Sequence, residues 1–360
     1  MILVAFGTRP ELLKIEPLLK HWKSIGYNDF RIWLSYQHEE LCIELSKNWE
    51  FKEYIIKYPY QDWDSNFNVQ DYNIIYEPNR LDNIVFGQLS ESNLVFKYNK
   101  ADYILVQGDT ATAFACALSA FHRKIPIIHL EAGLRSYDNE NPYPEEFYRR
   151  SISMMSSINL CPTRQNMVRL FSENVPGKCF VVGNTIIDPI KNIESLFENK
   201  ILITMHRREN HAEIKYWFEC FESLAEQFPD YEFILPIHKN PEIYKLKSMF
   251  KNVKCVDPLN HNDFIDILRR CKYVITDSGG VAEEATWFGK RIFLCRQRTE
   301  RPEGEQFYIW CKNTNELRKN FMEYMSYNPK TNLKITCPFG EGNSSEKITN
   351  ILLENSIIKI

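Results

Sequence analysis

The chain has 360 residues, more than one hydrophobic core usually supports, so we expect two domains. Hydrophobic residues make up 44% of the chain and charged residues 25%, which is typical of a soluble globular protein. A net charge of −3 argues against a nucleic-acid-binding surface, because such surfaces are normally basic.

Targeting and membrane segments are not expected either. The first residues, MILVAFGTRPELLK, pass from a few apolar residues into a charged helix, which is unlike a signal peptide. No apolar run approaches the roughly 20 residues that a membrane helix needs. The ten cysteines lie scattered between Cys42 and Cys337 without a CxxC pair, so we expect reduced, mostly buried thiols in a cytoplasmic protein.

Short apolar runs alternate with helical patterns through the first half. The run 2–6 ends at Gly7 and leads into a helix whose apolar positions Leu12, Ile15, Leu19 and Trp22 recur every three or four residues. Further strands are predicted at 31–37, 103–109, 125–133 and 158–163, whereas 51–99 shows no clear period. This alternation predicts a mainly parallel sheet with helices on both faces.

A second series of the same kind begins near Lys178. It has predicted strands at 201–206, 231–238, 253–259, 273–280 and 291–295, with a helix at 217–228 after the first of them. We expect two Rossmann-like, doubly wound domains facing a cleft, at 1–171 and 172–343, with the boundary somewhere in 165–195. The last helical segment, 344–360, is expected to pack back on the first domain.

The first polar motif, Gly7-Thr8-Arg9-Pro10-Glu11, is a strand-to-helix turn with proline suited to the first helical turn. Its free N–H groups, with Arg9 and Lys14, would attract a phosphate. A tight turn followed by a solvated helix face explains the same residues equally well.

Three carboxylates lie between Val106 and Arg150, where Asp109, Glu131 and Glu145 follow short apolar strands and precede Arg149. Acids at strand ends beside bases are typical of a site that binds phosphate and moves a proton. Asp109 could also be the N-cap of a helix over the following residues, and the two roles are compatible.

Histidines follow two strands of the second half. His206 ends a strand and is followed by two arginines, which favours a diphosphate contact, although a lone histidine is more often a structural hydrogen-bonding group. His238 gives a similar, weaker signal. No HExxH or Cys/His ligand set occurs, so no metal site is predicted.

A third turn joins the strand near 273–276 to a helix. Ser278, Gly279 and Gly280 would form a nest of N–H groups for a pyrophosphate, and Glu284 could grip ribose hydroxyls. The alternative is a glycine-rich helix N-cap. Neither GxxxxGK[ST] nor GxGxxG opens either half, which weakens ATP hydrolysis and NAD-dependent oxidation and favours nucleotide-sugar chemistry.

Taken together, the motifs resemble those of the UDP-N-acetylglucosamine 2-epimerases, enzymes of the glycosyltransferase-B fold type. They run in family order across nearly the whole chain, at residues 7–14, 107–114, 129–136, 144–149, 182–188, 206–210, 237–241, 276–284 and 299–304. The resemblance implies a homodimer that acts on a UDP-acetamido sugar without a cofactor.

The resemblance also implies roles for individual residues. Catalytic positions around the sugar and the leaving diphosphate fall on Asp109, Glu131, Glu145 and His206. The remaining substrate contacts fall on Arg9, Lys14, Arg149, His238, Phe264 (beside the uracil), Ser278, Gly279, Gly280, Glu284 (on the ribose) and Arg301.

The chain departs from the family pattern in a few places. Tyr148 stands where the family usually has Asn, and Ala282 where it usually has Gln. Residues 35–40 and 76–80 also differ, and these regions border a second, activating substrate molecule in bacterial members.

The expected reaction inverts the acetamido-bearing C-2 by elimination of UDP and re-addition through a 2-acetamidoglycal. Three enzyme alternatives stay open: the same reaction on a UDP-L-6-deoxy-acetamido sugar, a hydrolysing epimerase, and a glycosyltransferase. A non-catalytic nucleotide-sugar sensor is a fourth alternative.

Overall fold

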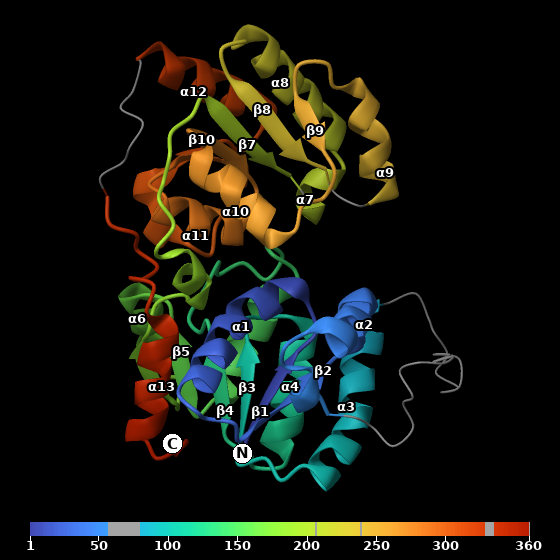
Figure 1. Cartoon of the computed structure of the whole chain (residues 1–360), viewed down its shortest axis with the longest axis vertical. Coiled ribbons are helices and arrows are strands. Elements are labelled where there is room, and N and C mark those ends of the chain that lie inside the picture. Colours follow the sequence, from blue (N-terminus) through green and yellow to red (C-terminus); the bar gives the residue numbers. More distant parts are fainter. Residues whose placement is uncertain (57–79, 206, 238–239, 328–334, 360) are drawn as a thin grey trace. The chain divides into compact units, whose positions relative to one another are not determined.

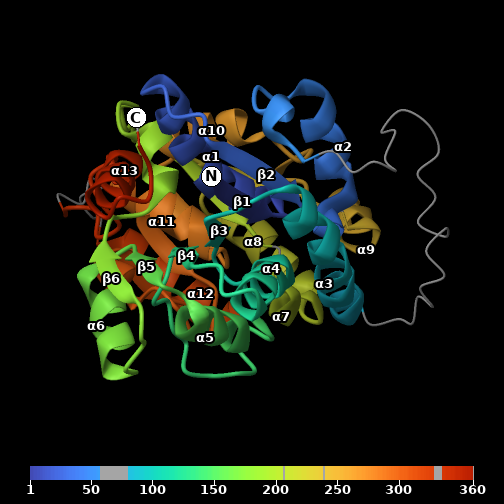
Figure 2. The ribbon, with the colours of Figure 1, turned by 90° about the horizontal axis from the view of Figure 1, so that it is seen from below.

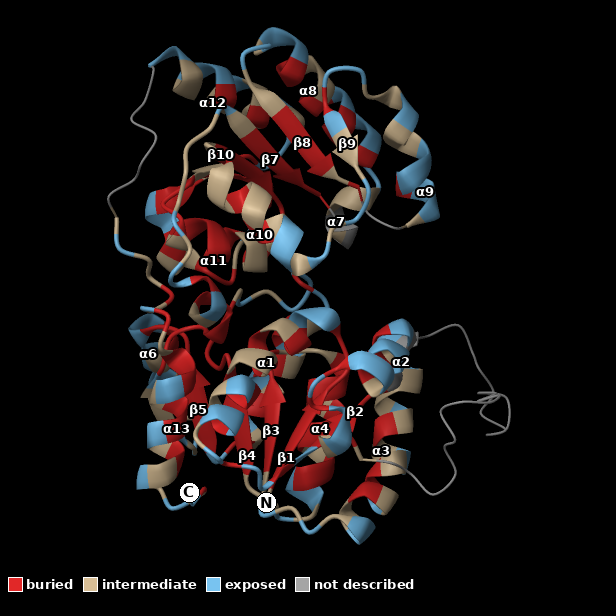
Figure 3. Ribbon diagram, in the orientation of Figure 1, coloured by how far each residue is buried: buried red, intermediate tan, exposed pale blue. Residues whose placement is uncertain are grey.

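The computed structural model describes residues 1–56, 80–205, 207–237, 240–327 and 335–359. Residues 1–189 and 340–360 form one compact unit, and residues 190–339 form a second. Each unit is built around a six-stranded parallel sheet (Figure 1). The strands of both sheets are mostly buried, and the outward sides of the helices carry the exposed residues (Figure 3). No helix in these described ranges is long and apolar enough to cross a membrane.

The first sheet has the strand order β2-β1-β3-β4-β5-β6, and all its neighbouring strands are parallel. Its strands are β1 (Ile2–Phe6), β2 (Phe30–Leu34), β3 (Tyr103–Gln107), β4 (Ile127–Leu130), β5 (Ile158–Cys161) and β6 (Lys178–Val181). The chain crosses to one side of β1 for β2 and to the other side for β3. Ligands of such sheets collect at this switch point, beyond the carboxyl ends of β1 and β3.

Helices cover both faces of the first sheet (Figure 2). Alternate residues of β1 serve the two faces: Ile2, Val4 and Phe6 join the core on one, and Leu3 and Ala5 the core on the other. The first face is covered by α1 (Arg9–Ser24), α2 (Glu39–Asn48) and α13 (Ser344–Glu354), and the second by α3 (Arg80–Tyr98), α4 (Ala111–His122) and α5 (Glu145–Met155). Helix α6 (Arg164–Ser172) packs beside β5 and β6.

The division between the units falls at 189/190, inside the range 165–195 expected from the sequence and 18 residues after the 171/172 boundary given for the domains. Strand β6 pairs in parallel with β5, with Lys178 opposite Ile158, and so completes the first sheet. The sequence pattern near Lys178 was interpreted as the start of the second series, whereas the structure assigns this strand to the first sheet. The chain then returns to this unit, where α13 packs against α1.

The second sheet has the strand order β12-β11-β10-β7-β8-β9 and is also entirely parallel. Its strands are β7 (Lys200–Thr204), β8 (Glu232–Pro236), β9 (Lys254–Val256), β10 (Tyr273–Thr276), β11 (Arg291–Leu294) and β12 (Tyr308–Trp310). This is the strand order of a Rossmann domain, and its switch point lies beyond the ends of β7 and β10.

Helices cover both faces of the second sheet as well. One face packs under α8 (Ile214–Gln227) and α12 (Thr314–Ser326), whose residues Trp217, Phe221 and Phe321 lie in the same core as Ile203 and Phe293. The other face carries α10 (His261–Arg270) and α11 (Gly279–Trp287). Two short helices, α7 (Arg208–His211) and α9 (Pro241–Tyr244), follow β7 and β8.

Candidate functional site

Two turns meet at the switch point of the first unit. The turn after β1 packs so closely that a Cβ on Gly7 would lie 2.2 Å from Ser35 Oγ, which explains the glycine. The turn after β3 contains Gly108, in the left-handed region at φ 69°, followed by Asp109. Thr110, and not Asp109, caps helix α4, because its hydroxyl accepts a hydrogen bond from Ala113 N at 3.0 Å. The sequence allowed Asp109 that role; in the structure its carboxylate turns elsewhere.

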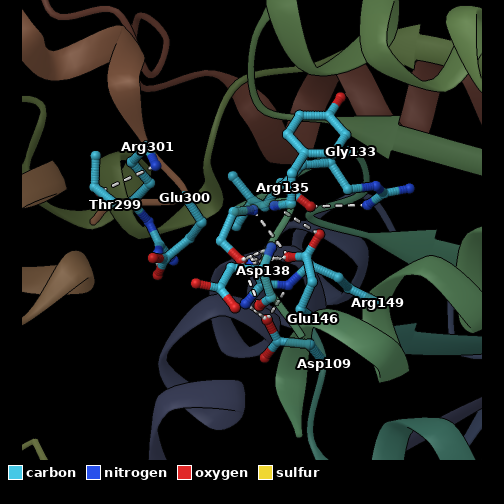
Figure 4. A network of polar contacts seen from close by, with 12 residues as sticks. Asp109, Gly133, Arg135, Asp138, Glu146, Arg149, Thr299, Glu300 and Arg301 are labelled. Carbon is cyan, nitrogen blue, oxygen red and sulfur yellow. Dashed lines mark hydrogen bonds and ion pairs between the residues drawn. The ribbon is translucent and has the colours of Figure 1, made fainter. Parts of the chain in front are cut away.

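The Asp109 carboxylate pairs with Arg149 of α5 (Figure 4). Arg149 Nε and Nη2 lie 2.9 and 2.5 Å from Asp109 Oδ2, and Nη1 lies 3.3 Å from Glu146 Oε2. The guanidinium is almost fully buried, so it stabilises the negative charge of both carboxylates in a medium that screens poorly. Glu145 is four residues before Arg149 on α5 and therefore lies on the same helix face.

Glu146 was not singled out from the sequence, although it follows the predicted Glu145. It is fully buried, and its carboxylate accepts hydrogen bonds from Ser136 N at 2.9 Å and Tyr137 N at 3.1 Å. It thus fixes the loop after β4 and one side of Arg149. The doubled acid in PEEFYR was the available signal, but nothing in the sequence tells which of the two carboxylates turns inward.

Glu131 lies one residue beyond β4 in the left-handed conformation, at φ 67°. Lys14 Nζ and Gln107 Nε2 both donate short hydrogen bonds to its carboxylate, and Asn184 Nδ2 donates at 3.3 Å. A Cβ on Gly108 would lie 3.6 Å from Glu131 Oε2, so this carboxylate is adjacent to the Asp109 turn. The structure therefore brings the predicted Lys14 and Glu131 together as a buried ion pair.

Arg9 does not join this cluster. Its guanidinium pairs with Glu44 of α2 at 2.5 Å, and its side chain is 54% exposed. A solvent-exposed pair of this kind contributes little to stability and can be exchanged for another anion.

His129 is a buried residue of the site that sequence reasoning missed. Its Nε2 lies 2.8 Å from the Gly108 carbonyl oxygen, and its Nδ1 lies 3.4 Å from Ser153 Oγ. Because a carbonyl oxygen only accepts, Nε2 carries the proton. Burial lowers the pKa of His129 to about 4, so the ring is neutral near pH 7 and holds the backbone just before Asp109.

The turn after β10 in the second unit begins helix α11 and contains the predicted Ser278, Gly279 and Gly280. Ser278 caps α11, and its hydroxyl accepts from Val281 N at 3.4 Å. A Cβ on Gly279 would meet Arg301 Nη1 at 2.5 Å, so only glycine lets this guanidinium approach the turn. Gly280 is open, with no heavy atom within 4 Å of a Cβ placed there. Arg301 Nε also donates to Glu283 at 2.6 Å.

Asp277 fixes this turn to the end of β7. Its buried carboxylate accepts from Arg207 N at 2.8 Å and from Asn210 Nδ2 at 3.0 Å. His206 and His238, both predicted site residues, lie outside the described residues.

The predicted ribose and uracil residues lie near one another on α11 and α10. Glu284 Oε1 lies 2.7 Å from His261 Nε2, and the half-buried Phe264 follows His261 by one helical turn. Of the predicted residues that the structure describes in this unit, Ser278, Gly279, Gly280, Glu284 and Arg301 lie in or beside the first part of α11.

These features define a class of protein with two Rossmann-like units, one presenting paired carboxylates and the other a glycine-containing turn at the start of α11. A family model described as UDP-N-acetylglucosamine 2-epimerase matches residues 58–353. The UDP-N-acetylglucosamine 2-epimerase of Neisseria meningitidis serogroup A is 34% identical over 98% of this chain and 99% of its own length.

Solved structures give the same result. The N. meningitidis UDP-GlcNAc 2-epimerase bound to UDP-GlcNAc has a TM-score of 0.81 and 33% identity, covering 98% of this chain and 100% of that one. The Methanocaldococcus jannaschii UDP-GlcNAc 2-epimerase in complex with UDP-GlcNAc and UDP has a TM-score of 0.79 and 28% identity, covering 98% and 99%.

The chain therefore belongs to the UDP-N-acetylglucosamine 2-epimerase family. The predictions of this family, of an epimerase enzyme and of two Rossmann-like domains of the glycosyltransferase-B type are confirmed.

Proposed function

We propose that the protein interconverts UDP-N-acetylglucosamine and UDP-N-acetylmannosamine without hydrolysis. The observation that carries this proposal is the pair of cation-bound carboxylates, Asp109 with Arg149 and Glu131 with Lys14, at adjacent strand ends of the first unit. The relatives of known structure bind UDP-GlcNAc, which supports the substrate class.

The chemistry explains why several carboxylates are needed. The hydrogen on the acetamido-bearing carbon has no adjacent carbonyl that could stabilise a carbanion, so simple deprotonation is too slow. If the C-1–oxygen bond to UDP breaks as the C-2 hydrogen leaves as a proton, the electron pair forms the C-1=C-2 bond of a 2-acetamidoglycal. UDP then adds back to C-1 while a proton is delivered to the opposite face of C-2.

In this proposal the first unit transfers the proton and the second unit binds the nucleotide. Asp109, Glu131 and Glu145 take and deliver the proton, and Arg149 and Lys14 stabilise the carboxylates between transfers. The turn at Ser278–Gly280, together with Arg301 and His206, holds the diphosphate as it leaves and returns. Glu284 binds the ribose and Phe264 packs on the uracil, while Arg9 and His238 complete the substrate contacts. No cofactor is required.

Replacing a carboxylate by its amide tests the acid/base role. We expect Asp109→Asn and Glu131→Gln to retain UDP binding by calorimetry and to lose turnover by about 100-fold or more. Asp102→Asn, at the exposed amino end of β3, is the matched control and should keep full activity. Near-wild-type epimerisation by either amide variant would remove that residue from the acid/base set.

Proton NMR of the same reactions decides between products. Conversion of UDP-GlcNAc into UDP-N-acetylmannosamine, with deuterium entering C-2 in heavy water, is the expected result. Free N-acetylmannosamine would show a hydrolysing enzyme instead. A panel that includes UDP-L-6-deoxy-acetamido sugars shows which sugar is turned over fastest.

A further inference from the structure

Glu11 is a buried carboxylate at the switch point of the first unit that the proposed reaction does not use. Its side chain is 1% exposed. One oxygen, Oε2, accepts from Gly7 N at 3.0 Å and from the Thr8 hydroxyl at 2.7 Å. The other oxygen, Oε1, accepts from the Thr110 hydroxyl at 2.7 Å. Glu11 thus links the turn after β1 to the turn after β3.

The geometry of the two threonine hydroxyls fixes the direction of their hydrogen bonds with Glu11. Thr8 and Thr110 are the N-caps of α1 and α4, and their oxygens accept from Glu11 N and Ala113 N respectively. A hydroxyl has a single proton, and in both threonines that proton goes to Glu11. The carboxylate therefore receives donors on both oxygens.

The turn after β1 is closely packed at Gly7. Ser35 Oγ and Thr112 Oγ1 lie 2.2 and 2.8 Å from a Cβ placed on Gly7, so there is no space for a side chain at this position. Asp109 directly precedes Thr110. A displacement of Thr110 away from Glu11 would therefore carry the Asp109 backbone with it.

Burying the Glu11 carboxylate is energetically unfavourable for its charged form. Desolvation raises the pKa of Glu11 to about 7, even though the hydrogen bonds from Thr110, Gly7 and Thr8 lower it. A group that served only to cap α1 would not need to be buried, because an N-terminal acid can act from the surface.

We propose that Glu11 is a positioning residue. By accepting a hydrogen bond from the Thr110 hydroxyl, it keeps the turn that carries Asp109 in a fixed position relative to the turn after β1. The consequence for turnover rests on the acid/base role proposed for Asp109. Displacement of a catalytic group by even about 1 Å can lower the rate by two orders of magnitude, so a loss of this link should reduce kcat.

The first test changes the donor. Thr110→Val keeps the shape of the side chain but removes the hydroxyl, and Thr110→Ser restores it. We expect kcat to fall about tenfold or more in Thr110→Val with KM changed by less than about threefold, and to recover to within about twofold of the parent in Thr110→Ser.

Thr163→Val is the matched control, because Thr163 caps α6 by the same type of bond, to Asn166 N. Both valine variants lose one helix cap and should lose similar thermal stability, but only Thr110→Val should lose kcat. Equal kcat values in the two valine variants, with the parent active, would overturn the proposal.

The second test is independent of activity. Glu11→Gln keeps the shape of the side chain but offers one uncharged acceptor oxygen to the three donors that the carboxylate accepts, Gly7 N and the Thr8 and Thr110 hydroxyls, so the link between the two turns is weakened. We expect faster amide hydrogen exchange at residues 108–110 in Glu11→Gln than in the parent, and unchanged exchange there in Thr163→Val. Unchanged exchange in Glu11→Gln would also overturn the proposal. A parent without epimerase activity would contradict the proposed function alone, since the exchange measurement would still decide the role of Glu11.

Discussion

Three buried side chains from three different elements hold the turn that carries Asp109. Glu11 accepts the Thr110 hydroxyl, His129 donates to the Gly108 carbonyl, and Arg149 pairs with Asp109 itself. Each contact restrains a different atom of the turn. Such redundancy is expected where a carboxylate must meet a substrate within a few tenths of an ångström.

His129 gives a prediction for the pH dependence of stability. Its folded pKa of about 4 lies below the ordinary value of 6.5, so the unfolded chain binds the proton more readily. The stabilisation is fully present above pH 6.5 and is lost as the pH falls towards 4, by up to about 3 kcal/mol.

We therefore expect His129→Gln, whose amide nitrogen can replace the Nε2 donor, to lose less thermal stability than the parent between pH 7 and 5. The measurement is the unfolding midpoint by calorimetry across this range. His122→Gln, at the exposed end of α4, is the control and should follow the parent. Parallel profiles for the parent and His129→Gln would contradict the prediction.

The sequence identifies residues with a proposed chemical role more readily than residues that hold them in position. Asp109, Glu131 and Lys14 were predicted because they follow strands and match family motifs. Glu11, Glu146 and His129 lie in the same motifs, but their roles depend on burial and on partners such as Thr110 and Ser136. A linear pattern does not contain that pairing.

At the level of elements, α13 shows how a distant segment is attached to the first unit. Its own N-cap, Asn343, makes no side-chain cap bond. Asp188 supplies the cap instead, accepting from Ser344 N at 2.9 Å and from Ser345 N at 2.7 Å. Charge at a helix N-terminus adds to these hydrogen bonds.

We expect Asp188→Asn to lower the free energy of unfolding by about 1–2 kcal/mol. Amide hydrogen exchange should become faster in α13 than it is in the parent, with a smaller change in the other helices. Asn343→Ala should change the stability by less than about 0.5 kcal/mol, since that side chain does not cap the helix. Equal exchange rates in α13 for parent and Asp188→Asn would show that the cap is unimportant.

The strands were the most predictable elements. Each apolar run predicted as a strand is present, because buried parallel strands are nearly continuous in hydrophobic residues. Strands β6 (Lys178–Val181) and β12 (Tyr308–Trp310) were not predicted; both are short edge strands that are only partly buried. Helix α3 (Arg80–Tyr98) lies in the stretch without clear period, where Gly87, Gln88 and Ser92 interrupt the apolar spacing.

For the whole molecule, the division into units is asymmetric along the chain. The second unit is one continuous segment, 190–339, whereas the first needs both 1–189 and 340–360. The buried side chains of α13, Ile348 and Leu352, belong to the same core as Leu18 of α1. The homodimer implied by the family and the cytoplasmic location inferred from the cysteines stay predictions at this scale.

This asymmetry predicts how fragments behave. Residues 190–339 contain their own sheet and core, so this fragment should unfold cooperatively on heating, as followed by circular dichroism. Residues 1–189 alone expose the apolar surface that α13 covers, and we expect a lower unfolding midpoint or aggregation. Ser344 N lies 2.9 Å from Asp188 Oδ1, so a short linker can rejoin 340–360 to residue 189. That fusion should unfold at a higher temperature than 1–189, because it restores Ile348 and Leu352 to the core.

The same fusion with Leu352→Ala is the matched control and should lose about 2–5 kcal/mol of the gain. If 1–189 were as stable as the fusion, α13 would be an accessory to the first unit and not part of its core.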